Sequence, residues 1–282
     1  MKIKKPWIVV RGGGDLASGT IHKLARCGYS VLVLEIENPS AIRRNVAFSE
    51  AVYEGSCQIE GITARLAVTL EEAQQMMKNR EIPVMVDPYG EILKEIQPEV
   101  LIDAILAKRN LGTNREMSPI TIALGPGFVA GMDVDAVIET KRGHYLGRVI
   151  LNGSAEPNTG VPGMIGGYAK ERVIHSPAEG ILRNVKHITN TVKKGEIIAL
   201  VETRDGTVEV PATIDGLLRG LIRDGYPVTK GFKIADIDPR MEEYENCFTI
   251  SDKARCIAGG ALEAMLYLQS EQRKQEIEWS SQ

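Results

Sequence analysis

The sequence contains few of the residues that build metal sites and disulfide frameworks. Among its 282 residues are four cysteines without CxxC spacing and four histidines that lie far apart. Zinc sites and disulfide-stapled domains need such residues at short, regular spacings, so we expect neither a metal site nor a disulfide framework. A chain of this length can bury a sizeable hydrophobic core without cross-links.

The chain also lacks an excess of positive charge and a long apolar run. Its 34 basic and 37 acidic residues leave a formal net charge of −3, which argues against nonspecific nucleic-acid binding. The apolar run after the basic start "MKIKKP" is too short for a signal peptide, and no stretch reaches the ~20 apolar residues of a membrane-spanning helix. We therefore expect a cytoplasmic protein that contacts neither nucleic acid nor membrane.

Short apolar runs alternate with helical patterns in the first part of the chain. Helices are predicted at Asp15–Cys27 and from Thr69, which has capping-box spacing to Glu72. Buried strands are predicted at residues 7–10, 29–36 and 83–87, from residue 99, and at 120–127. Such alternation predicts an α/β fold for residues 1–150: a Rossmann-like, mostly parallel sheet that binds a nucleotide or cofactor.

The stretch "VVRGGGDLASG" carries the G-x-G-x-x-A variant of the dinucleotide fingerprint. Its first glycine permits a tight turn, its second lets the backbone approach a pyrophosphate, and its alanine allows close packing of helix on strand. The helix start offers free N–H groups and a positive dipole end. An acidic residue is expected about 20 positions further on. The candidate cofactor-binding residues here are Gly12, Gly13, Gly14, Asp15, Ala17 and Glu35, with Glu37 as an alternative to Glu35.

Further candidates and the alternatives to a ligand site follow from the neighbouring loops. A glycine-rich turn needs no ligand, and the Asp15 carboxylate would itself cap the helix and repel a phosphate. Arg43 and Arg44, after the second strand, either clamp a phosphate or are solvated surface arginines. Gly125 and Gly127 stand where a strand should end, and ligands of open α/β sheets bind at the carboxyl ends of strands.

A repeat follows residues 151–174, a stretch rich in glycine and proline that we predict to be a linker or a site loop. The repeat has a constant offset of 36 residues, pairing Gly180 with Gly216, Arg183 with Arg219, Val192 with Val228, Gly195 with Gly231 and Ala199 with Ala235. Such an offset indicates two copies of one supersecondary unit. Residues 175–240 resemble the small all-β biotinyl/lipoyl-type barrel sandwich. Asp205 stands where lipoyl carriers have their acylated lysine, so we expect no lipoate or biotin.

Residues 241–282 are predicted to form a C-terminal helix, starting near Ser251, and a polar tail. An apolar stripe at helical period comprises Ala254, Ile257, Ala258, Ala261, Leu262, Met265 and Leu268. Gly259 and Gly260 interrupt this helix, and each glycine inside a helix costs about 1 kcal/mol. Their presence indicates close packing against the first domain or against a partner subunit.

The chain resembles the YqeB family of the selenium-dependent molybdenum hydroxylase system. The resemblance covers nearly the whole chain and rests on the strings "RGGGDLASGTIHKL", "ENPSAIRRNVAFSEAVYEG", "ALGPGFVAGMDVDAVIET", "RGHYLGRV" and "GLLRGLIRDGYPVTKGFKIADIDPR". The N-terminal half is more weakly similar to the Rossmann part of XdhC-type accessory proteins, which handle molybdenum cofactor for xanthine dehydrogenase. The resemblance implies a bacterial cytoplasmic accessory protein. It implies no established catalytic residue.

Three functions are compatible with these patterns. The first is a maturation factor that binds a nucleotide or a molybdopterin-type cofactor and serves a molybdenum hydroxylase or its maturation machinery. The second is an NAD(P)-dependent oxidoreductase, although no histidine or tyrosine constellation for hydride transfer stands out. The third is a noncatalytic scaffold whose β module recruits a partner. The resemblance favours the first, and a homo-oligomer is left open.

Overall fold

The computed structural model describes residues 7–158, 160 and 163–280, with side chains up to residue 274. The chain forms two compact units. The first comprises Met1–Pro39, Phe48–Asn158 and Ile250–Gln282, and the second comprises Ser40–Ala47 and Thr159–Thr249. The C-terminal helix therefore belongs to the first unit. The short segment after the second strand, which the sequence-based division places in the first domain, belongs to the second unit.

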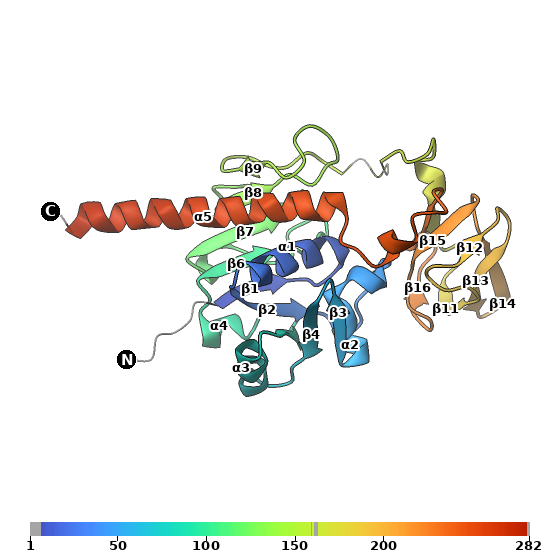
Figure 1. Ribbon diagram of the computed structural model, residues 1–282, viewed down its shortest axis with the longest axis horizontal. Coiled ribbons are helices and arrows are strands. Elements are labelled where there is room, and N and C mark those ends of the chain that lie inside the picture. Colours follow the sequence, from blue (N-terminus) through green and yellow to red (C-terminus); the bar gives the residue numbers. More distant parts are fainter. Residues whose placement is uncertain (1–6, 159, 161–162, 281–282) are drawn as a thin grey trace. The chain divides into compact units, whose positions relative to one another are not determined.

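The first unit is built on a nine-stranded mixed sheet in the order β3-β4-β5-β2-β1-β6-β7-β8-β9 (Figure 1). The strands from β4 to β8 in this order run parallel, whereas the edge strands β3 and β9 pair antiparallel with their neighbours. The strands are β1 (Trp7–Arg11), β2 (Ser30–Glu35), β3 (Ser56–Ile59), β4 (Ile62–Leu66), β5 (Ile82–Val86), β6 (Val100–Asp103), β7 (Ile120–Leu124), β8 (Ala136–Ile138) and β9 (Val149–Ile150).

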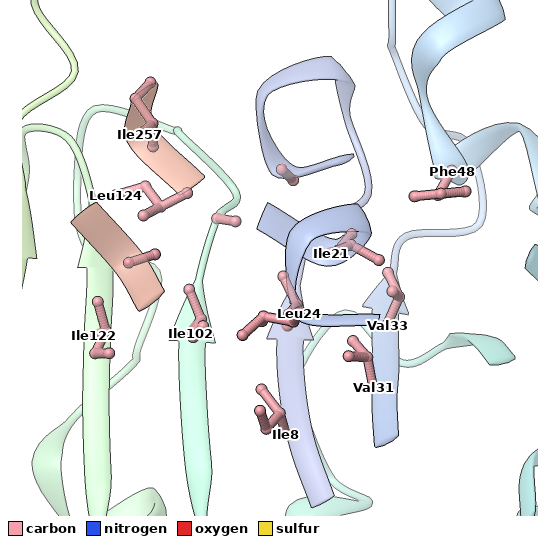
Figure 2. Close-up of a cluster of buried hydrophobic side chains, with 14 of the residues drawn as sticks. Ile8, Ile21, Leu24, Val31, Val33, Phe48, Ile102, Ile122, Leu124 and Ile257 are labelled. Carbon is pink, nitrogen blue, oxygen red and sulfur yellow. The ribbon is translucent and has the colours of Figure 1, made fainter. Parts of the chain in front are cut away.

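Helices cover both faces of this sheet because successive strand residues point to opposite faces. Ile8 and Val10 of β1 pack with α1 (Asp15–Arg26) and α5 (Asp252–Ser280), as Figure 2 shows for this layer of the core. Val9 lies in the opposite layer, with α3 (Leu70–Lys78) and α4 (Leu93–Ile96). The remaining helix, α2 (Ala51–Glu54), precedes β3. None of the helices in the described residues is both long and apolar enough to cross a membrane.

Local sequence signals at the helix ends are confirmed. Thr69 accepts a hydrogen bond from the Glu72 backbone N–H, and Glu72 reaches back to the Thr69 N–H, so the predicted capping box is present. Ser251 accepts from the Ala254 N–H at the start of α5. The predicted apolar stripe of α5 faces the core, although the helix continues through Ser280, further than its polar end predicts.

The second unit consists of two four-stranded antiparallel sheets, ordered β10-β17-β15-β12 and β14-β13-β11-β16. A hydrophobic core of residues from both sheets fills this unit. Its strands are β10 (Val173–His175), β11 (Gly180–Asn184), β12 (Thr191–Val192), β13 (Ile197–Thr203), β14 (Gly206–Pro211), β15 (Gly216–Leu221), β16 (Pro227–Val228) and β17 (Lys233–Asp238). Asp205 lies in the turn between β13 and β14.

The predicted repeat is confirmed by these strands. β11, β12 and β13 of the first copy correspond to β15, β16 and β17 of the second. The two copies exchange their short strands, because β12 pairs with β15 and β16 pairs with β11. Neither copy can complete its sheet without the other, so the repeats must fold together.

The fold class predicted from the sequence is wrong. In place of a Rossmann-like sheet followed by a barrel-sandwich module, the described residues form one mixed nine-stranded sheet and two separate antiparallel sheets. The physical reason is that apolar periodicity locates strands but does not reveal their partners. Among the strands of this sheet in the described residues, β1 and β4 are followed by helices of several turns, whereas β6, β7 and β8 succeed one another through 3₁₀ turns and loops. The antiparallel edge strands β3 and β9 have no apolar pattern that distinguishes them in the sequence.

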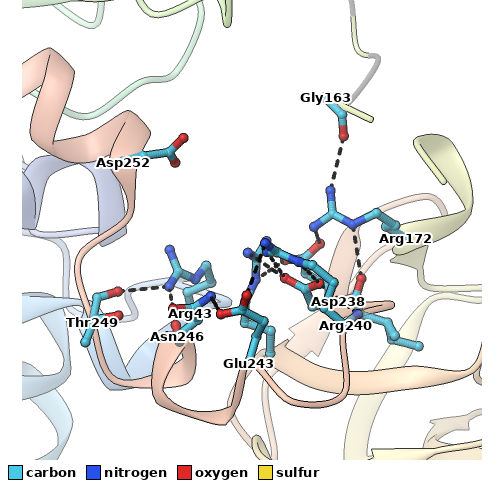
Figure 3. Close-up of polar contacts among 12 residues, drawn as sticks. Arg43, Gly163, Arg172, Asp238, Arg240, Glu243, Asn246, Thr249 and Asp252 are labelled. Carbon is cyan, nitrogen blue, oxygen red and sulfur yellow. Dashed lines mark hydrogen bonds and ion pairs between the residues drawn. The ribbon is translucent and has the colours of Figure 1, made fainter. Parts of the chain in front are cut away.

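A buried ionic network lies in the second unit around Asp236 and Asp238, which stand two residues apart in β17 and therefore on the same face of this strand. Figure 3 shows Asp238 with its ion-pair partner Arg240. Arg219 bonds to both carboxylates, with its Nη2 2.5 Å from Asp236 Oδ2 and its Nη1 3.2 Å from Asp238 Oδ2. Arg172 contacts Asp236 at 3.2 Å, and Arg240 contacts Asp238 at 2.8 Å. Both aspartates are buried, so their charges depend on these arginines.

We expect the second unit to lose stability as the pH falls below about 4, the ordinary range of an aspartate. Burial by itself would raise the pKa of Asp238, but hydrogen bonds from Arg240 and the charges of Arg219 and Arg240 lower it below its usual value. The ionised carboxylate therefore stabilises the fold above the unfolded pKa, and this contribution is lost as the pH falls through the folded pKa.

The measurement is amide hydrogen exchange of β15 and β17 across the acidic range. Asp238→Asn is expected to be less stable than wild type at neutral pH and to lose part of this acid dependence. Identical acid dependence in the two proteins would contradict the assignment to Asp238.

Candidate functional site

The glycine loop connects the carboxyl end of β1 to α1. Gly12 has a φ of +94°, a conformation that side chains other than glycine rarely adopt, and its N–H donates to the Leu34 carbonyl at 2.7 Å. A Cβ on Gly12 would lie 2.9 Å from the Ala104 oxygen, and a Cβ on Gly13 would lie 2.9 Å from the Ser49 nitrogen. The fold itself therefore requires glycine at both positions.

Gly14 differs from both of these glycines. It is the N-cap of α1, with φ −64° and ψ 177°, values that any residue can adopt. An added Cβ would meet nothing within 4 Å. The other described glycines with such open space have a positive φ, whereas Gly14 has an ordinary backbone conformation. Nothing within the described chain therefore requires glycine here.

The start of α1 presents its N–H groups beside this open space. Gly14, the N-cap residue, has no side chain with which to cap the helix, and Asp15 lies in the first turn. Ala17 is fully buried in the core between α1 and the sheet, as the fingerprint predicts for a close helix–strand contact. Backbone N–H groups at a helix start and the positive end of the helix dipole favour an anion at such a terminus.

Glu35 lies at the end of β2 and contacts the glycine loop. Its carboxylate accepts hydrogen bonds from the Gly13 N–H at 2.7 Å and from the Ile36 N–H at 2.8 Å. Burial raises the pKa of Glu35, and these two N–H donors oppose that rise. The structure thus brings together the loop and the acidic residue that the sequence pairs with it, because β1 and β2 are parallel neighbours.

A buried polar cluster that the fingerprint does not predict lies beside the loop. Arg11 ends β1 and Asp103 ends β6, the neighbouring parallel strand. The Arg11 Nη1 donates to the Thr113 hydroxyl at 2.5 Å, and this hydroxyl donates to Asp103 Oδ2 at 2.6 Å. Arg11 and Asp103 are only 2% and 1% exposed. The signal was available, since a charged residue ends the apolar runs "IVVR" and "VLID".

The loops after β6 and β7 meet the same edge of the sheet. The loop after β6 contacts Gly12 through Ala104, as described above, and its Leu106 and Lys108 have φ values of +60° and +62°. A Cβ on Gly127 would lie 2.6 Å from the Arg109 nitrogen, so this loop also contacts the loop after β7. Strained residues of this kind cluster at ligand sites.

The other glycine candidate in this loop is explained by packing. Gly125 has a φ of +82°, and a Cβ there would lie 2.7 Å from the Thr140 hydroxyl and 3.4 Å from a Leu106 methyl group. The loop after β6 therefore lies between the glycine loop and the segment with Gly125 and Gly127, and it contacts both. Lys108 and Arg109 are exposed in this connecting loop.

Arg43 and Arg44 belong to the second unit. The Arg43 Nη2 donates to the carbonyl oxygens of Asn246 at 2.9 Å and Thr249 at 3.2 Å (Figure 3). The Arg44 Nε donates to the Leu221 carbonyl at 2.8 Å. Both guanidinium groups thus hold backbone segments of this unit, a use that the sequence pattern did not indicate. Their contact with an anion stays a prediction.

Within the described residues, no group of three or more histidine, cysteine, aspartate or glutamate side chains is arranged to hold a metal ion. The chemistry that the glycine-loop edge offers is anion binding by backbone N–H groups, with a carboxylate and two exposed cations nearby. These groups suit the retention of a phosphate-bearing molecule. None of them forms a nucleophile–base pair.

Comparison with known proteins finds a similar protein by sequence. No known protein-family profile matches it. It is 51% identical over 262 residues to the uncharacterized protein YqeB of Escherichia coli (strain K12), a match that covers 93% of this chain and 47% of that protein. The chain thus spans about half the length of this curated relative.

Solved structures provide a much weaker comparison. The ectoine utilization protein EutE (DoeB) from Ruegeria pomeroyi aligns with a TM-score of 0.27 and 11% identity, over 83% of this chain and 85% of that chain. An aspartoacylase family protein from Mesorhizobium loti aligns with a TM-score of 0.26 and 13% identity, over 82% of this chain and 84% of that one. Neither similarity supports a functional argument. The sequence match is the stronger finding, and it makes 262 residues of this chain similar to about half of YqeB.

Proposed function

We propose that the chain binds a phosphate-bearing ligand, a nucleotide or a molybdopterin-type cofactor, at the glycine loop of residues 12–14. We further propose that it serves as an accessory protein for selenium-dependent molybdenum hydroxylases. The observation that carries the first part is the open space at Gly14. Neither the backbone conformation of Gly14 nor its neighbouring atoms require a glycine at this position. A bound ligand that occupies the space of a side chain would explain why a glycine stands there.

The surroundings of Gly14 suit an anion with a polar extension. A phosphate at the start of α1 would accept hydrogen bonds from backbone N–H groups and would lie at the positive end of the helix dipole. Glu35 already contacts the loop and can accept a hydrogen bond from a ligand hydroxyl. Lys108 and Arg109 offer flexible cations in the loop that contacts Gly12 and Gly127. The Asp15 carboxylate opposes the anion, so we expect the phosphate to be held on the Gly14 side of the helix start.

The accessory role draws on the resemblance to the selenium-dependent molybdenum hydroxylase system, and on the weaker resemblance of the N-terminal half to XdhC-type proteins. Molybdopterin carries a phosphate, often extended by a nucleotide, and therefore has the group that the glycine loop suits. The site lacks a nucleophile–base pair among the described residues, which favours holding and transferring a cofactor over chemical turnover.

Replacing Gly14 by valine is expected to weaken ligand binding more than tenfold, equivalent to about 1.4 kcal/mol, because the side chain fills the space at the helix start. The fold should be unaffected, since a Cβ at Gly14 meets nothing and its φ of −64° suits any residue. Calorimetry with NAD⁺, NADP⁺, GTP and isolated molybdopterin cofactor measures the effect, and thermal unfolding checks the fold.

Gly13→Val is the contrasting variant, because its Cβ would press on the Ser49 backbone and is expected to reduce stability. Equal affinity of wild type and Gly14→Val for every ligand that binds would refute the site. Oxidation of NADH or NADPH by the pure protein would favour the oxidoreductase alternative.

The cellular test uses a bacterium from which the gene is deleted. We expect the hydroxylase polypeptide to be present but short of active cofactor, with rescue by wild type and none by Gly14→Val. Full hydroxylase activity, with normal molybdenum and selenium content in the deletion strain, would exclude the accessory role.

A further inference from the structure

A second polar site lies in the first unit, on the second half of α1. A pocket of about 300 Å³ is formed by α1, by the turn between β3 and β4 and by the start of α5. Its lining is unusually basic, with three cations, one histidine and a single carboxylate. The lining residues are Gly19, His22, Lys23, Arg26, Glu60, Ile250 and Arg255.

The carboxylate in this pocket, Glu60, already accepts hydrogen bonds from within the chain. Glu60 Oε1 accepts from the Ile250 N–H at 2.8 Å and from Arg255 Nη2 at 2.5 Å. Glu60 also has a φ of +45°, a strained value for a glutamate in a tight turn. These bonds attach the turn to the start of α5 and neutralise one of the three cations. The pocket thus keeps a positive excess.

The remaining cations face no acidic partner among the described residues. Lys23 is half-buried and Arg26 is exposed, and neither forms an ion pair there. A Cβ on Gly259 of α5 would lie 3.7 Å from the Lys23 Nζ, which places this ammonium group against a glycine of the facing helix. Both residues lie in the last turn of α1, where the helix dipole favours cations. The dipole explains why cations stand at this helix end, but it does not explain why they line a pocket.

We infer that this pocket binds a small phosphate-bearing anion through Lys23, Arg26 and Arg255. Its volume suits inorganic phosphate, pyrophosphate or a small phosphorylated metabolite. Most of the side chains that line it are polar or charged, and Ile250 is the apolar side chain among them. This site is separate from the glycine loop, because it uses the second half of α1 and the proposed cofactor site uses the first turn.

His22 provides an internal reporter for this site. The residue is 8% exposed, and its Nε2 lies 3.4 Å from the Glu60 carbonyl oxygen and 4.0 Å from Glu60 Oε2. Burial lowers the pKa of His22, Glu60 raises it, and the charges of Arg255 and Arg26 lower it further. An anion bound between the surrounding cations favours the charged imidazolium, so binding should raise the pKa of His22.

The test is an NMR titration of the histidine ring signals with inorganic phosphate and with pyrophosphate, compared with potassium chloride at matched ionic strength. The titration is carried out on Gly14→Val, which removes binding at the glycine loop. We expect saturable shifts of the His22 signals and an upward shift of its pKa. The signals of His144, His175 and His187 serve as references within the same protein.

Lys23→Gln is expected to weaken phosphate binding about tenfold or more, as expected for a lost charge-assisted hydrogen bond. The matched control is Lys78→Gln, which removes an exposed lysine from the last turn of α3 and should leave the affinity unchanged. Lys23→Gln should also leave nucleotide binding at the glycine loop intact, so failure of one site is distinguishable from failure of the other.

Three results would overturn the inference. They are unchanged His22 signals with both anions, equal shifts with chloride, and equal affinity of Lys23→Gln and wild type. Any of these would leave Lys23 and Arg26 as solvated cations at a helix end.

Discussion

Replacing Gly260 by alanine is expected to destabilise the first unit by about 1–3 kcal/mol, the usual cost of overpacking, whereas the same replacement at Gly259 is expected to stabilise it by about 1 kcal/mol. The two glycines are adjacent in α5, so both replacements gain the same helix propensity. Their environments differ. A Cβ on Gly260 would collide with the Gly147 carbonyl oxygen and approach the Ile138 Cγ2 at 3.0 Å.

The collision at Gly260 is with backbone, which cannot move away by a change of rotamer. Gly147 has its own restriction, since its φ is +80° and a Cβ there would lie 2.7 Å from the Cys256 carbonyl oxygen. Helix α5 and the turn at Gly147 therefore pack backbone against backbone. Among the described residues outside its own helix turn, a Cβ on Gly259 would have only the mobile end of Lys23 within 4 Å, so a methyl group fits there. The close packing that the two glycines of this helix predict is thus confirmed for Gly260, which packs against the Gly147 turn.

Denaturant unfolding of the two single variants measures the difference. Gly19→Ala is a third variant from the facing helix, because its Cβ would lie 2.7 Å from the Ala254 carbonyl oxygen, and it should behave like Gly260→Ala. Equal effects of the changes at Gly259 and Gly260 would contradict the close approach of α5 to the Gly147 turn.

Removing the Asp103 carboxylate is expected to cost about 3–5 kcal/mol, because Arg11 would keep a buried charge without its acidic neighbour. Asp103 also accepts hydrogen bonds from the Thr113 hydroxyl at 2.6 Å and from the Ile105 N–H at 3.1 Å. Asp103→Ala therefore loosens the loop after β6 as well as the ion pair. Burial raises the pKa of Asp103, and its bonds to Thr113 and Ile105 and the charge of Arg11 oppose that rise.

Two further variants separate charge from shape. Asp103→Asn keeps an oxygen acceptor for Thr113, so it should lose less stability than Asp103→Ala. The double variant Arg11→Met with Asp103→Leu removes both charges and should recover much of the loss, since two apolar side chains can replace a buried ion pair. The measurement is the unfolding free energy of the three variants and of the wild-type chain. A double variant no more stable than Asp103→Ala would show that the Arg11 charge is not the cause.

The sequence determined the features that depend on neighbours within one or two turns. Short apolar runs located β1, β2, β5, β6 and β7, helical periodicity located the apolar stripe of α5, and the spacing of Thr69 and Glu72 predicted a capping box that is present. The offset of 36 residues predicted two equivalent sets of strands, which the second unit contains. The spacing of the dinucleotide fingerprint predicted Glu35, with Glu37 as an alternative, and the Glu35 carboxylate accepts a hydrogen bond from the Gly13 N–H.

Only the tertiary structure decided which distant residues meet. The mixed sheet with antiparallel edges, the exchange of β12 and β16 between the repeats and the Arg11–Thr113–Asp103 cluster all depend on pairings across long stretches of chain. The basic pocket joins residues from position 19 to position 255, a contact that no local spacing records. The physical reason is that periodicity reports the face on which a side chain lies, whereas the identity of its partner depends on packing among all elements at once.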